Sequence, residues 1–300
     1  MNKLRLAICI RGNLRSWNKC KNNIFKIFDY SDSFEVDWFF DTWHRDSWPN
    51  LIYSSDFKLI EKKQVIEPID DTIITSIKKD FDNNNLNLIS CTAHFDDTDD
   101  YGHFISQNKL MYLSNLSKRK HEIKIKKLYD VVLQIRPDCV YDENMGSLVE
   151  DGLKTLAFTS GFINMPGGCK DTKEELTCDI FMRPTTSSPQ LIAGGPSKLP
   201  LAYDLIFYGP NDEINMLSDC FLEIKDMKHF SNLIMGHTST AWYIRRYGTF
   251  LKHRHTAHIV RRIKIDDFYS YDEMSEDFLT DLTNEKHGLL AKLNNVFYAG

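Results

Sequence analysis

Arginine, glycine and small polar residues follow directly after an apolar run near the start of the sequence. The run Leu4–Ile10 predicts a buried strand, and the next residues read RGNLRS. Glycine lets a backbone turn sharply and approach a ligand closely, and the forked donors of arginine can hold a diphosphate. The alternative is an ordinary turn with solvated arginines. The predicted anion site consists of Arg11, Gly12, Asn13, Arg15 and Ser16. Either Ser16 or Asn18 could cap the next helix, whose free N–H groups attract phosphate oxygens.

A second polar group follows the apolar run Val36–Phe40. The stretch DWFFDTWH places Asp41, Thr42, Trp43 and His44 after this predicted strand. The indole of Trp43 could stack on a base or a sugar. The simpler interpretation is a half-buried tryptophan at the end of a strand.

A third group follows the run Val131–Ile135, within YDVVLQIRPDCVYD. This predicted strand leads into Arg136 and Asp138, and Asp142 follows four residues later. An acid at the end of a buried strand is costly unless it binds a metal, a sugar hydroxyl or an arginine. Asp138 could therefore ligate Mg²⁺ or Mn²⁺. The alternative is an internal ion pair between Arg136 and Asp138.

Apolar runs and helical patterns alternate along the chain, which predicts an α/β fold. Strands that are apolar throughout indicate a mostly parallel sheet covered by helices on both faces. In such sheets ligands bind beyond the carboxyl ends of the strands, so the three polar groups should converge. Strands are predicted at Leu4–Ile10, Val36–Phe40, Val131–Ile135, Thr155–Phe158 and Leu205–Tyr208, and helices at Asn18–Phe28, Gln107–Lys127 and Glu213–Ile224.

Length and composition predict one globular domain over residues 1–300, with 230–300 as a basic and helical extension. The chain is 42% hydrophobic, and no apolar run reaches the ~20 residues of a membrane span. The first residues do not resemble a signal peptide. We therefore expect a cytoplasmic protein, in the host cytoplasm if its origin is a phage or virus. The seven cysteines form no CxxC pair, which favours reduced and mostly buried thiols.

Charge is distributed unevenly along the chain. The net charge is −5, but residues 245–264 carry +7 with no acid, which leaves −12 elsewhere. A basic segment on an acidic protein suggests a localised anion partner. Nucleic acid is one such partner, so a nucleic-acid-binding protein that uses 245–264 is the alternative function. His253, His255 and His258 have a spacing that could ligate zinc, although a basic strand or loop explains them more simply.

Five motifs in one order carry a family resemblance. The chain contains LAICIRGNLRSW, VDWFFDTWH, SQNKLMYLSNL, YDVVLQIRPDCVYD and YDLIFYGPNDEINML, which together cover residues 4 to 215. This order resembles a family of glycosyltransferases of large DNA viruses, phages and bacteria. The resemblance implies a GT-A-like fold, a Rossmann-related three-layer sandwich that binds a nucleotide-sugar. It also implies a DxD element that holds a divalent metal on the donor diphosphate. Here that position reads Arg136-Pro137-Asp138, so arginine replaces the first acid.

The resemblance also implies roles for individual residues. Thr42 and Trp43 would line the nucleoside, Gln107 and Lys109 would contact the donor sugar or diphosphate, and Asp138 would bind metal or sugar. An inverting transferase needs a base for the acceptor hydroxyl, and a carboxylate suits that role. The candidate catalytic residues are Asp204, Asp212 and His237.

These observations predict a transferase that moves a sugar from a nucleotide-sugar, UDP-linked, to a hydroxyl. The acceptor would be a glycan or a hydroxymethylated base in phage DNA. A metal-dependent phosphoryl-transfer enzyme is a weaker idea, because the clustered carboxylates that two metals require are missing.

Overall fold

The molecule is described here from a computed structural model. It describes residues 3–53, 59–95, 102–141, 143–157, 162–166, 206–224, 249–253, 257–259 and 263–265. The helices are α1 (Trp17–Phe28), α2 (Asp71–Asn83), α3 (Gly102–Ile125), α4 (Glu143–Leu156) and α6 (Asn211–Ile224). Central strands are β1 (Leu4–Arg11), β2 (Phe34–Trp43), β5 (Leu88–His94), β6 (Val131–Ile135), β8 (Phe162–Pro166), β9 (Ile206–Pro210) and β10 (Thr249–His253). The remaining strands are β3 (Arg45–Tyr53), β4 (Leu59–Pro68), β7 (Cys139–Tyr141), β11 (Ala257–Ile259) and β12 (Ile263–Ile265).

Seven described strands form the central sheet, in the order β10-β8-β9-β6-β1-β2-β5. β1 pairs in parallel with β2 and β6, and β2 pairs in parallel with β5. Only β9 among them runs against its neighbours. β1 lies inside the sheet, between β6 and β2, and buries apolar side chains on both faces: Leu6, Ile8 and Ile10 on one side, and Ala7 and Cys9 on the other.

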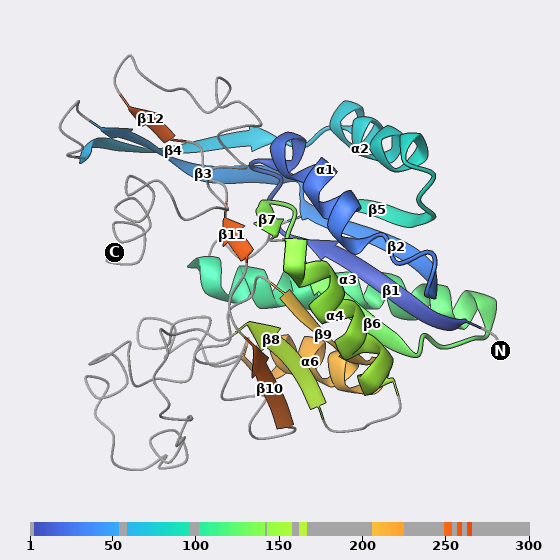
Figure 1. Ribbon diagram of the computed structural model, residues 1–300. Coiled ribbons are helices and arrows are strands. Elements are labelled where there is room, and N and C mark those ends of the chain that lie inside the picture. Colours follow the sequence, from blue (N-terminus) through green and yellow to red (C-terminus); the bar gives the residue numbers. More distant parts are fainter. Residues whose placement is uncertain are drawn as a thin grey trace, which may run out of the picture.

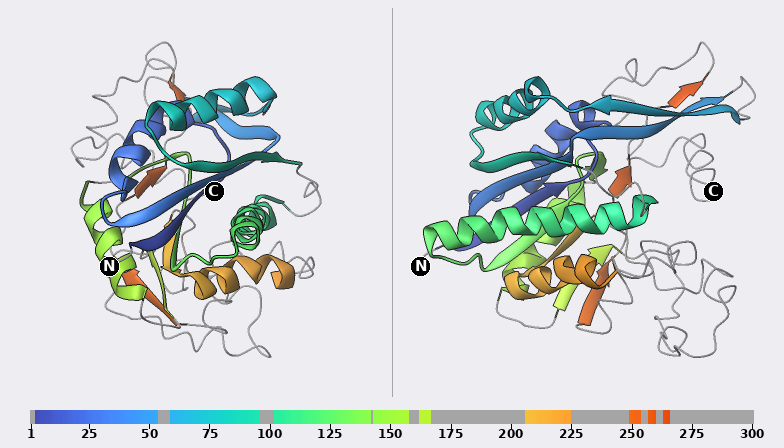
Figure 2. Two further views of the ribbon diagram at one scale, coloured as in Figure 1. Left: turned by 90° about the vertical axis from the view of Figure 1, so that its right-hand side faces the viewer. Right: turned by 180° about the vertical axis from the view of Figure 1, so that it is seen from behind.

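Helices cover both faces of this sheet, as Figures 1 and 2 show. Helices α1, α2 and α4 lie on one face, and α3 and α6 pack together on the other. The predicted three-layer α/β sandwich with a mostly parallel sheet is therefore confirmed. Both faces of the strands are removed from water, which explains why these runs are mostly apolar.

The α1 face of the sheet contains a large aromatic core. Helix α1 buries Trp17, Cys20, Ile24 and Phe28, a spacing that places them on one side of a helix. The Trp17 ring packs edge-on against Phe40 of β2, with ring centroids 4.9 Å apart. An aromatic pair in this geometry stabilises a fold by about 1 kcal/mol beyond the contribution from burying the two rings. This packing fixes where α1 begins, and therefore the length of the turn between β1 and α1.

Strands β3 and β4 form an antiparallel hairpin that extends away from the central sheet (Figure 1). β12 adds to its β3 edge. The basic segment 245–264 is thus divided, because β10 joins the central sheet, β11 pairs with β7, and β12 pairs with the hairpin.

The strand predicted at Thr155–Phe158 is wrong in its described part, which belongs to the end of α4. Met145, Val149 and Leu153 recur every four residues and are all buried. Thr155 and Leu156 are the last two residues of this helix, and Ala157 lies in the turn that follows, so the described residues form no strand here. The extension predicted at 230–300 has described residues only in β10, β11 and β12, and the predicted helices at its end lie outside the described residues.

Within the described ranges, every helix is too short or too polar to cross a bilayer. Five cysteines fall in those ranges, and all five are free thiols: Cys9, Cys20, Cys91, Cys139 and Cys220.

Candidate active site at the carboxyl ends of β1, β2 and β6

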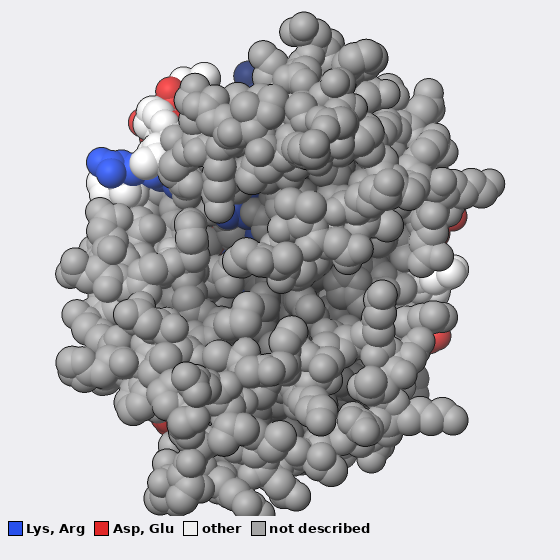
Figure 3. All heavy atoms as spheres, turned by 90° about the vertical axis from the view of Figure 1, so that its left-hand side faces the viewer, with Lys and Arg blue, Asp and Glu red and all other residues white. Residues whose placement is uncertain are grey.

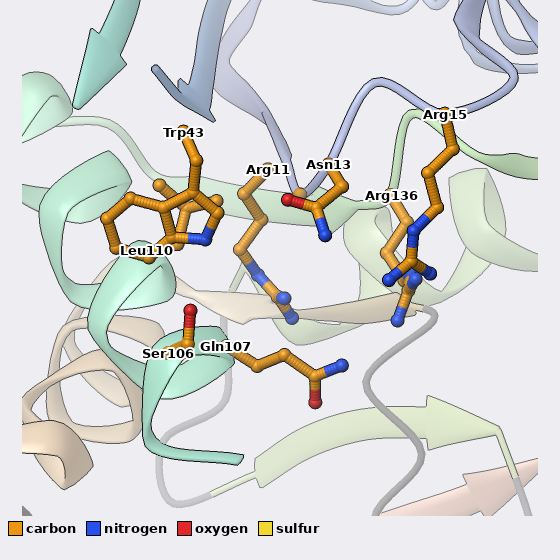
Figure 4. A pocket seen from close by; sticks show the side chains of 9 residues that line it. Arg11, Asn13, Arg15, Trp43, Ser106, Gln107, Leu110 and Arg136 are labelled. Atoms are coloured by element: carbon orange, nitrogen blue, oxygen red, sulfur yellow. The ribbon is translucent and has the colours of Figure 1, made fainter. Parts of the chain in front are cut away.

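A pocket lies where three parallel strands end. Figure 3 looks onto this edge of the molecule and shows Lys or Arg atoms of described residues near its centre, and Figure 4 shows the pocket from close by. Three arginines and no acid are among the described residues that line it. The lining residues are Arg11, Gly12, Asn13, Arg15, Trp43, Ser106, Gln107, Leu110 and Arg136.

Arg11 is the last residue of β1 and is held from behind by neutral groups. Its Nε donates to Oε1 of Gln134 at 3.1 Å, and Nε2 of Gln134 donates to Oγ of Ser218 at 3.1 Å. Its guanidinium carbon lies 5.7 Å from the ring centroid of Phe207. Because Gln134 and Ser218 carry no charge, they orient this guanidinium without neutralising it.

Gly12 allows the chain to turn beside the neighbouring loop. Its φ is +146°, a conformation that side-chain-bearing residues rarely adopt. A Cβ at this position would lie 2.9 Å from Cδ of Pro137. The glycine therefore lets the loop after β1 contact the loop after β6 directly.

Arg15 and Arg136 share one carboxylate. Nε and Nη2 of Arg136 donate to Oδ1 and Oδ2 of Asp138, each at 2.8 Å. Nη1 of Arg15 donates to Oδ2 at 3.2 Å. In Figure 4 the two guanidinium groups lie side by side. Asp138 is 0% exposed, so the carboxylate lies beneath the arginines and keeps both at the pocket wall.

Asp138 does not fit its predicted role as a metal ligand. It is absent from the pocket lining, and both of its oxygens accept hydrogen bonds from guanidinium groups. The internal ion pair, which was the alternative interpretation, is the observed arrangement. No group of three His, Cys, Asp or Glu side chains that could hold a metal ion occurs among the described residues.

Backbone groups around these arginines are also fixed. The backbone N–H of Arg15, which has φ +32°, donates to Oδ2 of Asp46 at 2.5 Å. The backbone N–H of Arg136 donates to the hydroxyl of Tyr141 at 3.1 Å. Burial raises the pKa of Tyr141 well above its usual value, so this hydroxyl stays protonated. Both arginines therefore extend from backbone segments that the protein holds in place.

The opposite wall of the pocket is partly apolar. Trp43, the last residue of β2, and Leu110 of α3 lie on the side away from Arg15 and Arg136 (Figure 4). Ser106 and Gln107 of α3 complete this wall. The pocket thus has a cationic side suited to an anion and an aromatic side suited to a flat ring.

A buried polar network supports the Trp43 side. Oδ1 of Asp41 is hydrogen-bonded to Nε2 of His94 at 2.7 Å and accepts from Oγ of Ser117 at 2.9 Å. These contacts tie the ends of β2 and β5 to α3. Nζ of Lys109 lies 5.9 Å from the Trp43 ring centroid, within cation–π range.

Six residues predicted from the strand ends line the pocket: Arg11, Gly12, Asn13, Arg15, Trp43 and Arg136. Gln107, which was predicted from the resemblance, lines it as well. Thr42, Ser16 and Lys109 do not line it. Thr42 is buried on the other face of β2, as strand alternation requires, and Ser16 is buried at the start of α1 without a side-chain cap bond. The ammonium of Lys109 lies 5.9 Å from the ring centroid of Trp43, which does line the pocket.

Asp212 lies at the other end of the strands from the pocket. β9 runs antiparallel to β6, so Pro210 pairs with Val131 at the start of β6, and Asp212 follows in the first turn of α6. The sequence prediction placed it in the site because strand direction could not be determined from the apolar pattern. Asp204 and His237 lie outside the described residues.

Sequence reasoning missed Ser106, Leu110 and Gln134. Ser106 and Leu110 lie one helical turn apart on α3, on the same face as Gln107, so the predicted helix contained a signal for them. Gln134 lies on β6, two residues before Arg136, which directly follows the strand. A buried glutamine inside an apolar strand was the available sign of a polar partner.

No known protein-family model matches this sequence, and no curated protein matches it. Two solved glycosyltransferase structures are similar over 84% of this chain. The apo form of glycosyltransferase GlyE from Streptococcus pneumoniae TIGR4 is 10% identical, with a TM-score of 0.39. The apo form of mouse xyloside xylosyltransferase 1 is 11% identical, with a TM-score of 0.40. This chain covers 46% of the GlyE chain, about half its length, and 85% of the mouse chain.

Proposed function

We propose that the chain is a glycosyltransferase that binds a nucleotide-sugar, UDP-linked, in the pocket at the carboxyl ends of β1, β2 and β6. One observation carries the proposal. Arg11, Arg15 and Arg136 meet at a single pocket, and no acid is among the described residues that line it. A diphosphate ester carries a negative charge on each phosphate, and guanidinium forks match phosphate oxygens.

The remaining wall suits the other parts of such a donor. Trp43 and Leu110 offer an aromatic and an apolar surface for the base or the sugar ring. Gln107 and Ser106 offer hydrogen-bonding groups for hydroxyls. A charged end joined to an aromatic end is the pattern of a nucleotide, whereas an isolated phosphate would need only the charged end.

The reaction would proceed by displacement at the anomeric carbon. The acceptor oxygen forms a bond to that carbon while the bond to the diphosphate oxygen breaks, and the nucleoside diphosphate leaves with the electron pair. The hydroxyl proton passes to a base. The arginines would stabilise the charge that develops on the leaving diphosphate. Asp204 and His237 stay predictions for the base, and a glycan or hydroxymethylated DNA base stays the predicted acceptor.

Calorimetric titration with UDP, GDP, CDP and their sugar conjugates tests the proposal. We expect one of these nucleotides to bind, and Arg11→Gln to weaken its binding about tenfold or more, because a charged hydrogen bond contributes about 1.5–3 kcal/mol. Lys26→Gln is the matched control, since Lys26 is exposed on α1 and pairs with Glu143 away from the pocket. The proposal fails if none of the nucleotides binds, or if both variants bind as the wild type does.

A further inference from the structure

We infer that the diphosphate binds to this pocket without a divalent cation, and that Asp138 positions Arg15 and Arg136 instead of ligating a metal. The inference rests on the proposed function and specifies how its donor is held. It departs from the GT-A pattern implied by the resemblance, in which acids at the end of this strand hold a metal on the diphosphate.

The hydrogen bonds of Asp138 leave its carboxylate directed toward protein groups. The two Arg136 bonds use both oxygens, and Arg15 adds a third bond to Oδ2. Metal ligation needs carboxylate lone pairs that face the ligand. A metal at Asp138 would have to displace guanidinium groups and would then lie next to two buried cations, Arg15 at 9% and Arg136 at 6% side-chain exposure.

The charge that a metal would supply is already present. Arg136 stands at the position where the resembling pattern has its first acid, so the substitution replaces a negative group by a positive one. Arg11 adds a second guanidinium, whose Nε donates to the neutral side chain of Gln134. Three guanidinium groups are thus among the described residues that line the pocket, and Asp138 lies behind two of them. Guanidinium forks match the phosphate oxygens of a diphosphate.

The three arginines are also pre-arranged. The loops after β1 and β6 are in direct contact at Gly12 and Pro137, and Asp138 links a side chain from each loop. Long cationic side chains lose rotamer freedom when they bind a ligand. A carboxylate that holds two of them before the ligand arrives reduces that loss, and this defines Asp138 as a positioning residue.

The first test needs no variant. The affinity of the full chain for UDP is measured by calorimetry in EDTA, then in Mg²⁺, then in Mn²⁺. We expect dissociation constants that agree within about twofold. Binding that is lost in EDTA and restored by either cation overturns the inference while it supports the proposed function. Absence of nucleotide binding under all three conditions overturns both.

The second test separates positioning from metal ligation at Asp138. In EDTA a metal ligand has no role, so under metal ligation Asp138→Asn would bind UDP as the wild type does. Under positioning, Asp138→Asn weakens UDP binding about tenfold in EDTA and equally with Mn²⁺. Asp219→Asn is the matched control, because Asp219 forms a similar two-bond pair with Arg119 between α3 and α6, and it should leave binding unchanged.

A double-mutant cycle shows whether Asp138 acts through Arg136. Arg136→Lys keeps the charge but cannot form the two-bond pair. If Asp138 acts through this pair, Asp138→Asn should cost clearly less affinity in the Arg136→Lys background than in the wild type. Fully additive effects would contradict the positioning role.

Discussion

At the residue scale, the site depends on how each side chain is held as much as on which side chain is present. Arg11 is oriented by the uncharged Gln134, whereas Arg136 is oriented by the charged Asp138. The first partner leaves the guanidinium charge intact, and the second reduces it but fixes its geometry on two bonds. Together, the two kinds of partner leave positive charge in the pocket and fix the direction in which the guanidinium groups point.

Substitution of Gly12 should affect both the stability of the fold and nucleotide binding. Gly12→Ala should destabilise the fold by roughly 1–3 kcal/mol, because the backbone conformation at φ +146° is unfavourable for alanine and the new Cβ would meet Pro137 at 2.9 Å. Nucleotide binding should weaken too, since the loops that carry Arg15 and Arg136 must shift. Urea unfolding and calorimetry measure the two effects. An alanine variant as stable as the wild type would contradict the described turn.

At the element scale, the contact between α3, α6 and the sheet is unusually polar. Lys118 of α3 is fully buried, donates to Oε2 of Glu122 at 3.2 Å and also bonds to Oδ1 of Asn211. Oε1 of Glu122 accepts from the backbone N–H of Tyr129 at 3.0 Å and from Asn211 at 2.9 Å. The network joins α3 to the start of α6 and to the segment before β6, and burial lowers the pKa of Lys118.

Removal of one charge from this network should be costly. We expect Glu122→Gln to lower the free energy of unfolding by about 3 kcal/mol, because the buried ammonium of Lys118 loses its charged partner. The double variant Lys118→Met/Glu122→Gln should recover part of that loss. Asp219→Asn, in a half-exposed pair, should cost less than about 1 kcal/mol. Equal losses at Glu122 and Asp219, measured by urea unfolding, would show that burial does not set the cost.

At the scale of the whole molecule, the site exists because three strands run in the same direction. β2 and β6 each pair in parallel with β1, so Arg11, Trp43 and Arg136, which are 32 to 125 positions apart in the sequence, meet at the carboxyl ends of these strands. The same topology buries thiols within both helix layers. Burial raises the pKa of Cys9 and of Cys91 from 9.0 to about 12, and it raises the pKa of Cys20 and Cys220 as well.

The raised pKa values of these thiols predict how the free energy of unfolding changes at alkaline pH. Above pH 9 the unfolded chain releases thiol protons that the folded chain retains up to about pH 12 for Cys9 and Cys91. Folding stability should therefore be independent of these groups below pH 9 and fall as the pH rises through the window, by roughly 1 kcal/mol per pH unit for each thiol. Urea midpoints at pH 8, 9, 10 and 11 measure this fall. Cys9→Ala should flatten it, and an unchanged slope would contradict the assignment.

The sequence by itself determined the strand ends and most of the cationic side of the pocket. Leu4–Ile10 is apolar apart from Arg5, and Val131–Ile135 is apolar apart from Gln134. Each run is followed at once by arginine, so its burial and its polar end could be predicted locally. Hydrophobic periodicity encodes which residues face a core, because burial depends on side-chain polarity at fixed spacing. It also predicted α1 to within one residue at each end, whereas α3 begins five residues before its predicted start at Gln107.

Only the tertiary structure decided which groups meet and which way a strand runs. Apolar pattern is the same for both strand directions, so the antiparallel course of β9, and with it the removal of Asp212 from the pocket, could not be predicted. The sequence is compatible with Asp138 binding either a metal or an arginine. In the structure Asp138 accepts a hydrogen bond from Arg15, which is 123 positions away in the sequence. Local sequence patterns indicate which residues are buried. Ion pairs and hydrogen bonds across the sheet depend on distances that exist only once the chain has folded.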